Sequence, residues 1–412
     1  MTREARITPL HKLQPVADTV AEKSGAGVAS LEARTAAVAA MAAACAAAVD
    51  RDARFPEEAI AAARAQRLLG IMVPRELGGE GASLGDVADV CYRLGRACAS
   101  TGMIYAMHQT KIACLVRHGR SSAWHERLLR RICTEQLLLA SSTTEGQGGG
   151  DIRSSAAAVE RNGSRIGLER RATVISYGAY ADGVVTTARR SADAAASDQV
   201  LVAFVKENYV LEPFLAWDTL GMRGTCSAGF TLKAQGDIEQ ILPVPYEKIH
   251  QQTMVPVAHL CWAAVWTGAA AGAVERAQNF LRNAARQSNG QLPPGAPHFM
   301  KATSALRTLR SLVASAVRNY EAVADDERAL ASLDFQTTIN LTKVEASEMA
   351  VSVVLSALRA CGLSGYRNDG DFTVGRHLRD VLSSPIMINN DRILANVSGA
   401  ALLSAIPASV QA

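Results

Sequence analysis

The chain has 412 residues, of which 49% are hydrophobic and 20% are charged, and its formal net charge is +4. The small charge and scattered basic residues exclude an electrostatic footprint for nucleic acid, and the longest apolar run, residues 36–49, is too short to span a bilayer. The eight cysteines show no CxxC pair and no zinc spacing. We therefore expect a cytoplasmic protein with free thiols, no metal and no membrane partner.

The first part of the chain predicts an arm followed by helices. Residues 1–28 mix Pro, Lys, Gly and Ser without periodicity and predict a loose N-terminal arm. Residues 29–136 predict an N-terminal helical domain. Pro56, followed by two glutamates, is typical of a helix start, because proline suits the first turn and acids suit its positive end. Residues 84–97 predict a further helix, and the glycines of residues 77–81 predict a loop before it.

The pattern changes in the middle of the chain. Between residues 137 and 245 the sequence holds short runs rich in Val, Ile, Thr and Phe. Asn162-Gly163 lies between two such runs and predicts a two-residue hairpin turn. This part therefore predicts a middle antiparallel, β-barrel-like domain. The strand-like runs are residues 156–160, 183–189, 199–206 and 229–233.

The helical period returns in residues 246–412. Apolar residues between Leu341 and Leu358 recur at spacings of three, four and seven, and Gly362 predicts the helix end. The length allows a C-terminal four-helix bundle. The predicted fold class is therefore mainly α with a central β domain.

Four glycine- or hydroxyl-bearing stretches interrupt these elements. Glycines allow close approach of a backbone to a ligand, and hydroxyls supply adaptable hydrogen bonds, although each stretch alone is typical of a turn or cap. The four are TEGQGGGD (144–151), VISYG (174–178), LGMRGT (220–225) and CGLSGY (361–366). In this order, followed by an Arg-Asp pair at 379–380, they resemble the TEPGxGSD, WITNG, LGxRxSxT, GGxGY and RD pattern of the acyl-CoA dehydrogenase family. Residues 55–83 also resemble the opening of that family.

The resemblance covers about residues 30–405. It implies an FAD-dependent oxidoreductase that oxidises the α,β bond of an acyl thioester, carried by coenzyme A or acyl-carrier protein. It also implies a homodimer or homotetramer, with electron-transferring flavoprotein or oxygen as electron acceptor. The positions that the resemblance assigns to FAD are Thr143, Thr144, Gly150, Ile175, Ser176, Arg286, Arg359, Gly362 and Gly365.

The catalytic base of the family is missing from its usual place. Counted from the Arg-Asp pair, the usual glutamate falls at Ile388, in the stretch SPIMINND. The alternative glutamate position of some family members falls at Cys261 or Trp262. An isoleucine cannot accept a proton, so dehydrogenation would need a substitute base.

Three substitute bases are open on the sequence. Asp391 lies one turn beyond Ile388 and could reach a pocket, but Asn389, Asn390 and Asp391 are also good helix-capping residues. His108 titrates near neutrality, which suits acid–base work, but a lone histidine on a helix is more often a satisfied core or surface group. The third, Glu145, belongs to the stretch that the resemblance assigns to the flavin, where a structural role is more typical.

Three functions remain open on the sequence. The first is an acyl-CoA or acyl-carrier-protein dehydrogenase with a non-standard base. The second is a flavin-dependent monooxygenase or oxidase of the same fold, which needs no α-proton base. Val174 favours it, because it replaces the tryptophan that faces the electron acceptor in the family. The third is a non-catalytic flavin-binding subunit.

Overall fold

The computed structural model describes residues 29–145, 153–403 and 406. Its N-terminal part is helical, as predicted, and serine side chains cap three of its α-helices, the first, the third and the fifth. Ser30 caps the first helix by accepting a hydrogen bond from the backbone N–H of Ala33, and Ser83 and Asp86 form a capping box on the third. The helices are α1 (Leu31–Arg51), α2 (Glu57–Ala65), η1 (Arg75–Leu77), α3 (Leu84–Ala97), α4 (Ala99–His118) and α5 (Ala123–Glu135).

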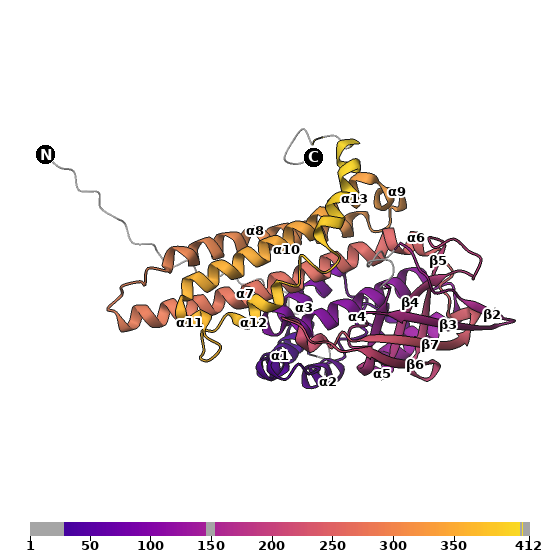
Figure 1. Cartoon of the computed structure of the whole chain (residues 1–412), viewed down its shortest axis with the longest axis horizontal. Helices are drawn as coiled ribbons and strands as arrows, with labels where there is room; N and C mark the ends of the chain where they lie inside the picture. The colour runs from indigo at the N-terminus through magenta and orange to yellow at the C-terminus, as the bar shows by residue number, and fades with distance from the viewer. Residues whose placement is uncertain (1–28, 146–152, 404–405, 407–412) are drawn as a thin grey trace, which may run out of the picture.

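The middle part forms two sheets (Figure 1). One sheet has the order β1-β4-β5, built from β1 (Leu139–Ser142), β4 (Gly183–Arg189) and β5 (Gln199–Val205). The other has the order β2-β3-β7-β6, built from β2 (Glu160–Asn162), β3 (Arg165–Ala172), β7 (Gly229–Asp237) and β6 (Tyr209–Leu215). Short 3-10 helices join them: η2 (Gly178–Tyr180), η3 (Lys206–Asn208), η4 (Arg223–Thr225) and η5 (Ile238–Gln240).

Two details of this part differ from the expectation. β1 pairs with β4 in parallel, because β1 enters the sheet directly from the helical part and no hairpin joins the two strands. The run predicted at 156–160 makes only an isolated bridge, between Ala158 and Arg189, and β2 begins at its last residue. A two-residue hairpin turn does join β2 to β3, but it is shifted by one residue from the prediction. Asn162 ends β2 and pairs with Arg165, so the turn is Gly163-Ser164, and Gly163 has the positive φ of 62° that such turns require.

The C-terminal part is helical again. Its three long helices α7, α8 and α10 lie side by side, and the shorter α13 packs against α10 (Figure 1). The elements are α6 (Tyr246–Ile249), the π-helix η6 (His250–Met254), α7 (Val255–Gln287), α8 (Ala296–Val323), α9 (Glu327–Ala331), α10 (Leu333–Cys361), α11 (Leu363–Tyr366), α12 (Gly375–Val381) and α13 (Asn390–Leu403).

The N-terminal and C-terminal helical parts pack tightly along α3 and α7. A Cβ at Gly268 would lie 2.1 Å from the carbonyl oxygen of Tyr92, and one at Gly95 would lie 2.4 Å from that of Val265. Only glycine permits so close an approach. The most apolar part of the helix Tyr246–Gln287 is 94% buried inside the molecule, so its length and hydropathy reflect a core helix. The N-terminal α1, also long and apolar enough to span a membrane, has 39% of its most apolar window buried.

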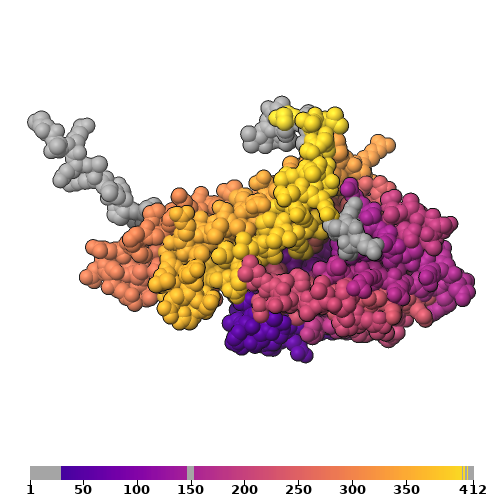
Figure 2. All heavy atoms as spheres, in the orientation of Figure 1, coloured from indigo at the N-terminus to yellow at the C-terminus, as the bar shows by residue number. Residues whose placement is uncertain are grey.

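One hydrophobic core joins all three parts, with residues from α3, α4, both sheets, α7 and α10 in a single cluster. Figure 2 shows the C-terminal helices along one side of the molecule and the β sheets at the other end. The three parts meet around the first turns of α7, and that junction holds the site described next.

Candidate functional site

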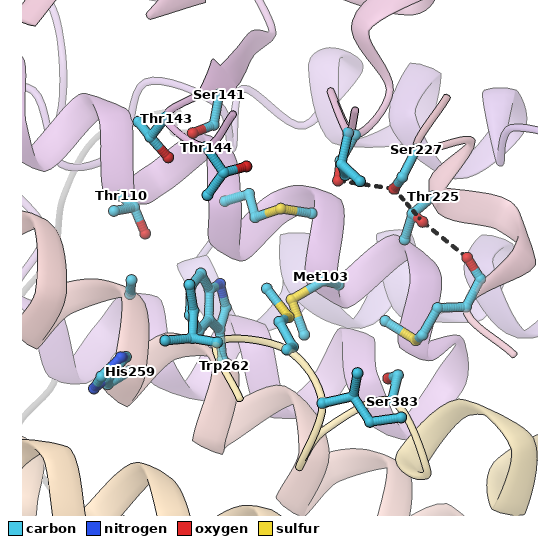
Figure 3. A pocket seen from close by; sticks show the side chains of 18 of the residues that line it. Met103, Thr110, Ser141, Thr143, Thr144, Thr225, Ser227, His259, Trp262 and Ser383 are labelled. Atoms are coloured by element: carbon cyan, nitrogen blue, oxygen red, sulfur yellow. Dashed lines mark hydrogen bonds between the residues drawn. The ribbon is translucent and has the colours of Figure 1, made fainter. Parts of the chain in front are cut away.

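A cavity of about 590 Å³ lies where α4, the first turns of α7, the end of β1 and the segment before α13 meet (Figure 3). Its volume is within the usual range for small-molecule sites. Most of its wall is apolar. The large apolar side chains of this wall are Met103, Met107, Trp217, Leu220, Met222, Met254, Trp262, Leu382, Ile386, Met387 and Ile388.

Hydroxyl groups line the part of the wall that faces the β sheets (Figure 3). Thr143 and Thr144 follow β1 directly, and Ser176 follows β3. Ser227 Oγ donates a hydrogen bond to Ser176 Oγ at 2.8 Å. Ser176 accepts that bond, so its own hydroxyl proton is available to a ligand in the cavity.

Backbone strain gathers around this cavity. Met222 and Ile388, which line it, have φ values of 53° and 48°, and Tyr177 and Cys226, next to lining residues, have φ values of 45°. Positive φ is uncommon for residues other than glycine and is unusual for a β-branched residue such as isoleucine. Such strain persists only where surrounding contacts hold the backbone, and it clusters at ligand-binding sites.

The stretch SPIMINND is held from outside by one buried lysine. Lys343 on α10 is fully buried. Its ammonium group donates to the carbonyl oxygens of Ser384 (3.1 Å) and Ile388 (2.9 Å) and to Oδ1 of Asn390 (2.7 Å). These contacts keep Ile388 on the cavity wall in its strained conformation. The position at which the family's glutamate was expected is therefore a pocket position, and it carries an apolar side chain.

The Arg-Asp pair at 379–380 supports the cavity wall. The buried Asp380 accepts a hydrogen bond from the backbone N–H of Met222 at 2.7 Å, and Arg379 forms an ion pair with Asp50. A Cβ at Gly221 would lie 2.0 Å from the carbonyl oxygen of Arg379. The glycine of LGMRGT is therefore needed for this close contact. Burial raises the pKa of Asp380 to about 6.

Asp391, the first proposed substitute base, is not brought to the cavity. It is exposed on the first turn of α13 and is absent from the cavity wall. The side chain of Asn389 caps that helix by accepting a hydrogen bond from the backbone N–H of Asp391 at 2.8 Å. The capping alternative thus describes this stretch, with Asn389 as the cap.

His108, the second proposed substitute base, is also kept from the cavity. Its ring is fully buried, Nδ1 accepts from the backbone N–H of Leu139 at 3.0 Å, and Nε2 donates to the carbonyl oxygen of Leu69 at 2.8 Å. Burial lowers the pKa of His108 to about 4. The ring is a neutral structural link between α4 and β1, and both of its nitrogen atoms are already occupied.

Replacing His108 by leucine is expected to cost about 2–3 kcal/mol of unfolding free energy at pH 7.5, because the buried N–H of Leu139 loses its acceptor. A depressed histidine pKa stabilises the fold above the unfolded-state pKa, and that stability is lost as pH falls toward 4. The wild type should therefore lose about 2 kcal/mol between pH 7.5 and 5 through this group. Urea denaturation measures the unfolding free energies of the wild type and of His108→Leu at both pH values. The difference between them should be smaller at pH 5 than at pH 7.5 by that amount. An equal difference at both would contradict a neutral buried His108.

The predicted flavin contacts fall into two groups. Thr143, Thr144 and Ser176 line the cavity. Ile175 lies next to it but is fully buried, with its backbone N–H donated to the carbonyl oxygen of Ala228. Gly150 lies outside the described residues.

The other predicted contacts lie at the far end of the bundle. Arg286 and Arg359 are exposed, Gly362 ends α10 with a positive φ of 55°, and Gly365 lies in α11. Arg286 follows Trp262 by 24 residues along α7, which is roughly 36 Å at the helical rise. The described chain therefore does not bring these four positions to its own cavity.

Three ionisable residues of the cavity wall, Lys111, Tyr246 and His259, were not predicted from the sequence. All three are buried. Burial lowers the pKa of Lys111 to about 8 and that of His259 to about 3. One signal was present for Lys111. Met103, Met107, Thr110 and Lys111 recur at helical spacing and form the face of α4 that meets the cavity.

Comparison with known proteins shows which protein families and relatives this chain resembles. Residues 29–136 match the model of the acyl-CoA dehydrogenase N-terminal domain, and residues 251–403 match that of the C-terminal domain. The chain is 28% identical to a cyclohex-1-ene-1-carbonyl-CoA dehydrogenase of Geobacter metallireducens, over 86% of this chain and 92% of that protein. It is 25% identical to the amino sugar nitrososynthase DnmZ of Streptomyces peucetius, over 82% and 84%.

A solved structure shows the same fold. The FMN-bound TdsC of Paenibacillus sp. A11-2 superposes with a TM-score of 0.80 over 92% of this chain and 98% of that chain, at 17% identity. Relatives in sequence thus include proteins named as dehydrogenases and one named as a nitrososynthase. Similarity alone leaves open which of these chemistries the cavity supports.

Proposed function

Because this chain belongs to the acyl-CoA dehydrogenase family, we propose that it is a flavin-dependent monooxygenase that acts on a small, largely apolar organic molecule. The chain is an oxidoreductase, and FAD is the cofactor of its family. The specific reaction is the proposal. It rests on one observation: among the described residues that line the cavity, none is Asp or Glu.

The cavity wall fits a flavin ring. A flavin presents carbonyl oxygens and ring nitrogens along one edge and apolar faces elsewhere. The hydroxyls of Thr143, Thr144 and Ser176 lie together on one side of the cavity, and the Ser176 proton is available to an acceptor. These three side chains are the groups that would hold the polar edge of the ring.

The absence of a carboxylate from the described cavity wall favours monooxygenation over dehydrogenation. Dehydrogenation of an acyl thioester requires a base beside the α-carbon, and this place is taken by the aliphatic side chain of Ile388. Monooxygenation requires no such base. A reduced flavin, when bound, supplies two electrons to O₂, so that one oxygen atom enters the substrate and the other leaves as water.

The chain's own residues supply what this reaction needs. The apolar wall of methionine and tryptophan side chains binds an apolar substrate and excludes bulk water. His259 lies in the same wall with a pKa lowered to about 3 by burial. It is therefore neutral at physiological pH and adds no charge to the cavity.

The test compares oxygen and acyl-CoA on the same FAD-loaded protein. With NADH, a flavin reductase, ¹⁸O₂ and a panel of two-ring aromatic compounds, we expect product that contains one ¹⁸O atom. Catalase and superoxide dismutase should leave the yield unchanged. Without oxygen, a panel of acyl-CoAs should not bleach the flavin. Bleaching of the wild-type flavin by any of them would overturn the proposal.

A second candidate is a relative of the acyl thioester dehydrogenases that still binds acyl thioesters but has lost the base needed to oxidise them. It is favoured by the 28% identity to a cyclohex-1-ene-1-carbonyl-CoA dehydrogenase along most of the chain. The variant Ile388→Glu separates the two candidates, because a positioned base contributes about 10²–10⁴-fold to such a step. We expect no anaerobic bleaching from this variant either. Bleaching by Ile388→Glu alone would show that the cavity admits acyl thioesters and would favour the second candidate.

We also propose that the active form is at least a homodimer. The supporting observation is that Arg286, Arg359, Gly362 and Gly365 lie far from the cavity of their own chain. Only a second copy could bring these positions to a flavin bound in the first. Light scattering on the FAD-loaded protein measures the molar mass, and a monomer would contradict this proposal.

A further inference from the structure

Lys111 is a buried cation that faces the cavity. It lies on α4, its residue is 3% exposed, and it forms part of the cavity wall. Its Nζ lies 2.8 Å from the Sδ atom of Met254. A thioether is a weak hydrogen-bond acceptor, and the described residues offer the ammonium group no stronger partner.

No ion pair joins Lys111 to an aspartate or glutamate in the part of the chain that the structure describes. The other charged side chain of the cavity wall, Arg379, is paired with Asp50. A buried charge without a counter-ion is costly in free energy. In a ligand-binding cavity, that cost is offset when a ligand brings the missing negative charge.

We propose that Lys111 binds an anionic oxygen, a carboxylate or a phenolate, at the buried end of an otherwise apolar substrate. This inference deepens the proposed function and rests on it for the identity of the substrate cavity. The surrounding wall of Met103, Met107, Met254 and Trp262 accepts the apolar body of such a molecule. Lys111 would then fix its orientation by charge, which apolar contacts cannot do.

Lys111 is the group whose charge changes near neutral pH, because burial moves the pKa values of its ionisable neighbours away from that range. Burial raises the pKa of Cys114, on the same helix, to about 12 and raises that of Tyr246, on α6, as well. The pKa of His259, on α7, is lowered to about 3, and Arg379, from α12, is paired with Asp50. Lys111, with a pKa lowered to about 8, is charged below that pH and neutral above it. Anion binding should therefore weaken as pH rises through about 8.

The experiment uses two probes of the same shape on the FAD-loaded protein: 1-naphthoate, an anion, and 1-naphthamide, which is neutral. Binding is measured by calorimetry, without turnover. We expect the wild type to bind naphthoate at least tenfold more tightly than naphthamide at pH 7. The variant Lys111→Met should lose this preference and keep its affinity for naphthamide. The exposed Lys301→Met is the matched control and should behave as the wild type.

Two further measurements separate this role from a structural one. The naphthoate affinity of the wild type should fall about tenfold per pH unit above pH 8, and that of Lys111→Met should not change with pH. Without ligand, Lys111→Met should melt at a higher temperature than the wild type, because it removes an uncompensated buried charge.

Equal affinity of the wild type for both probes, binding of neither, or a preserved preference in Lys111→Met would overturn the inference. The ¹⁸O experiment tests the reaction independently. An anion preference that depends on Lys111, together with no oxygen insertion, would leave this site standing and overturn the proposed monooxygenase.

Discussion

Replacing Glu145 by alanine is expected to lower the free energy of unfolding by about 3–5 kcal/mol. Glu145 Oε1 lies 3.1 Å from Nη1 of Arg170, and the two side chains are 8% and 0% exposed. The carboxylate also accepts hydrogen bonds from the backbone N–H groups of Ala156 and Ala157. Its loss leaves a buried guanidinium without its counter-ion and two amides without their acceptor.

The same replacement should weaken flavin binding, because Thr143 and Thr144 directly precede Glu145 and line the cavity. Urea denaturation measures the first effect, and titration of the stripped protein with FAD measures the second. Glu135→Ala is the control. That glutamate forms an exposed ion pair with Arg131 one helical turn away, and its loss should cost less than about 1 kcal/mol.

A double variant tests whether loss of the ion pair causes the instability of Glu145→Ala. Glu145→Leu with Arg170→Met removes both charges and should recover much of the lost stability, because apolar replacement of a buried pair is often close to neutral. A double variant as unstable as Glu145→Ala would show that the two backbone amides, and not the ion pair, account for the effect.

Replacing Lys343 by methionine is expected to lower the free energy of unfolding by about 2–4 kcal/mol, because Ser384, Ile388 and Asn390 lose a buried donor. The backbone of Ile388, at a φ of 48°, should then relax. Hydrogen exchange followed by mass spectrometry should show faster exchange of peptides that cover residues 384–390. Because Ile388 lines the cavity, affinity for FAD and for apolar probes should fall as well.

The matched control is Lys233→Met. Lys233 lies on β7 and forms an ion pair with Glu212 in which both side chains are about half exposed, so its loss should cost less than about 1 kcal/mol. If Lys343→Met were as stable as this control and showed unchanged exchange, Lys343 would not be what holds SPIMINND in place.

Much of the fold could be predicted, because it depends on patterns that short stretches of chain carry. The change from a helical to a strand-like hydrophobic pattern and back indicates the order helical, β, helical. The pair Asn162-Gly163 indicates the hairpin between β2 and β3. The parallel pairing of β1 with β4 could not be predicted in this way. This pairing joins strands separated by about 40 residues, and the composition of neither strand indicates which strand it will pair with.

The candidate site was predicted in part. Motif residues with hydroxyl groups, Thr143, Thr144 and Ser176, do reach the cavity. Thr143 and Thr144 directly follow β1, and Ser176 lies four residues after the end of β3. The substitute bases Asp391, His108 and Glu145 do not reach the cavity. His108 and Lys111 lie on the same helix, three residues apart, and only the rotation of α4 against its neighbours decides which one faces the cavity.

The sequence alone determined the family, the order of the three parts and the apolar residue at position 388, since these are properties of residue type and spacing. The tertiary structure decided that Ile388 lies on a cavity wall, that Lys343 holds it there and that Lys111 faces the same space. These facts depend on contacts between helices far apart in the chain. Such contacts follow from how buried surfaces fit together, and local sequence does not encode that fit.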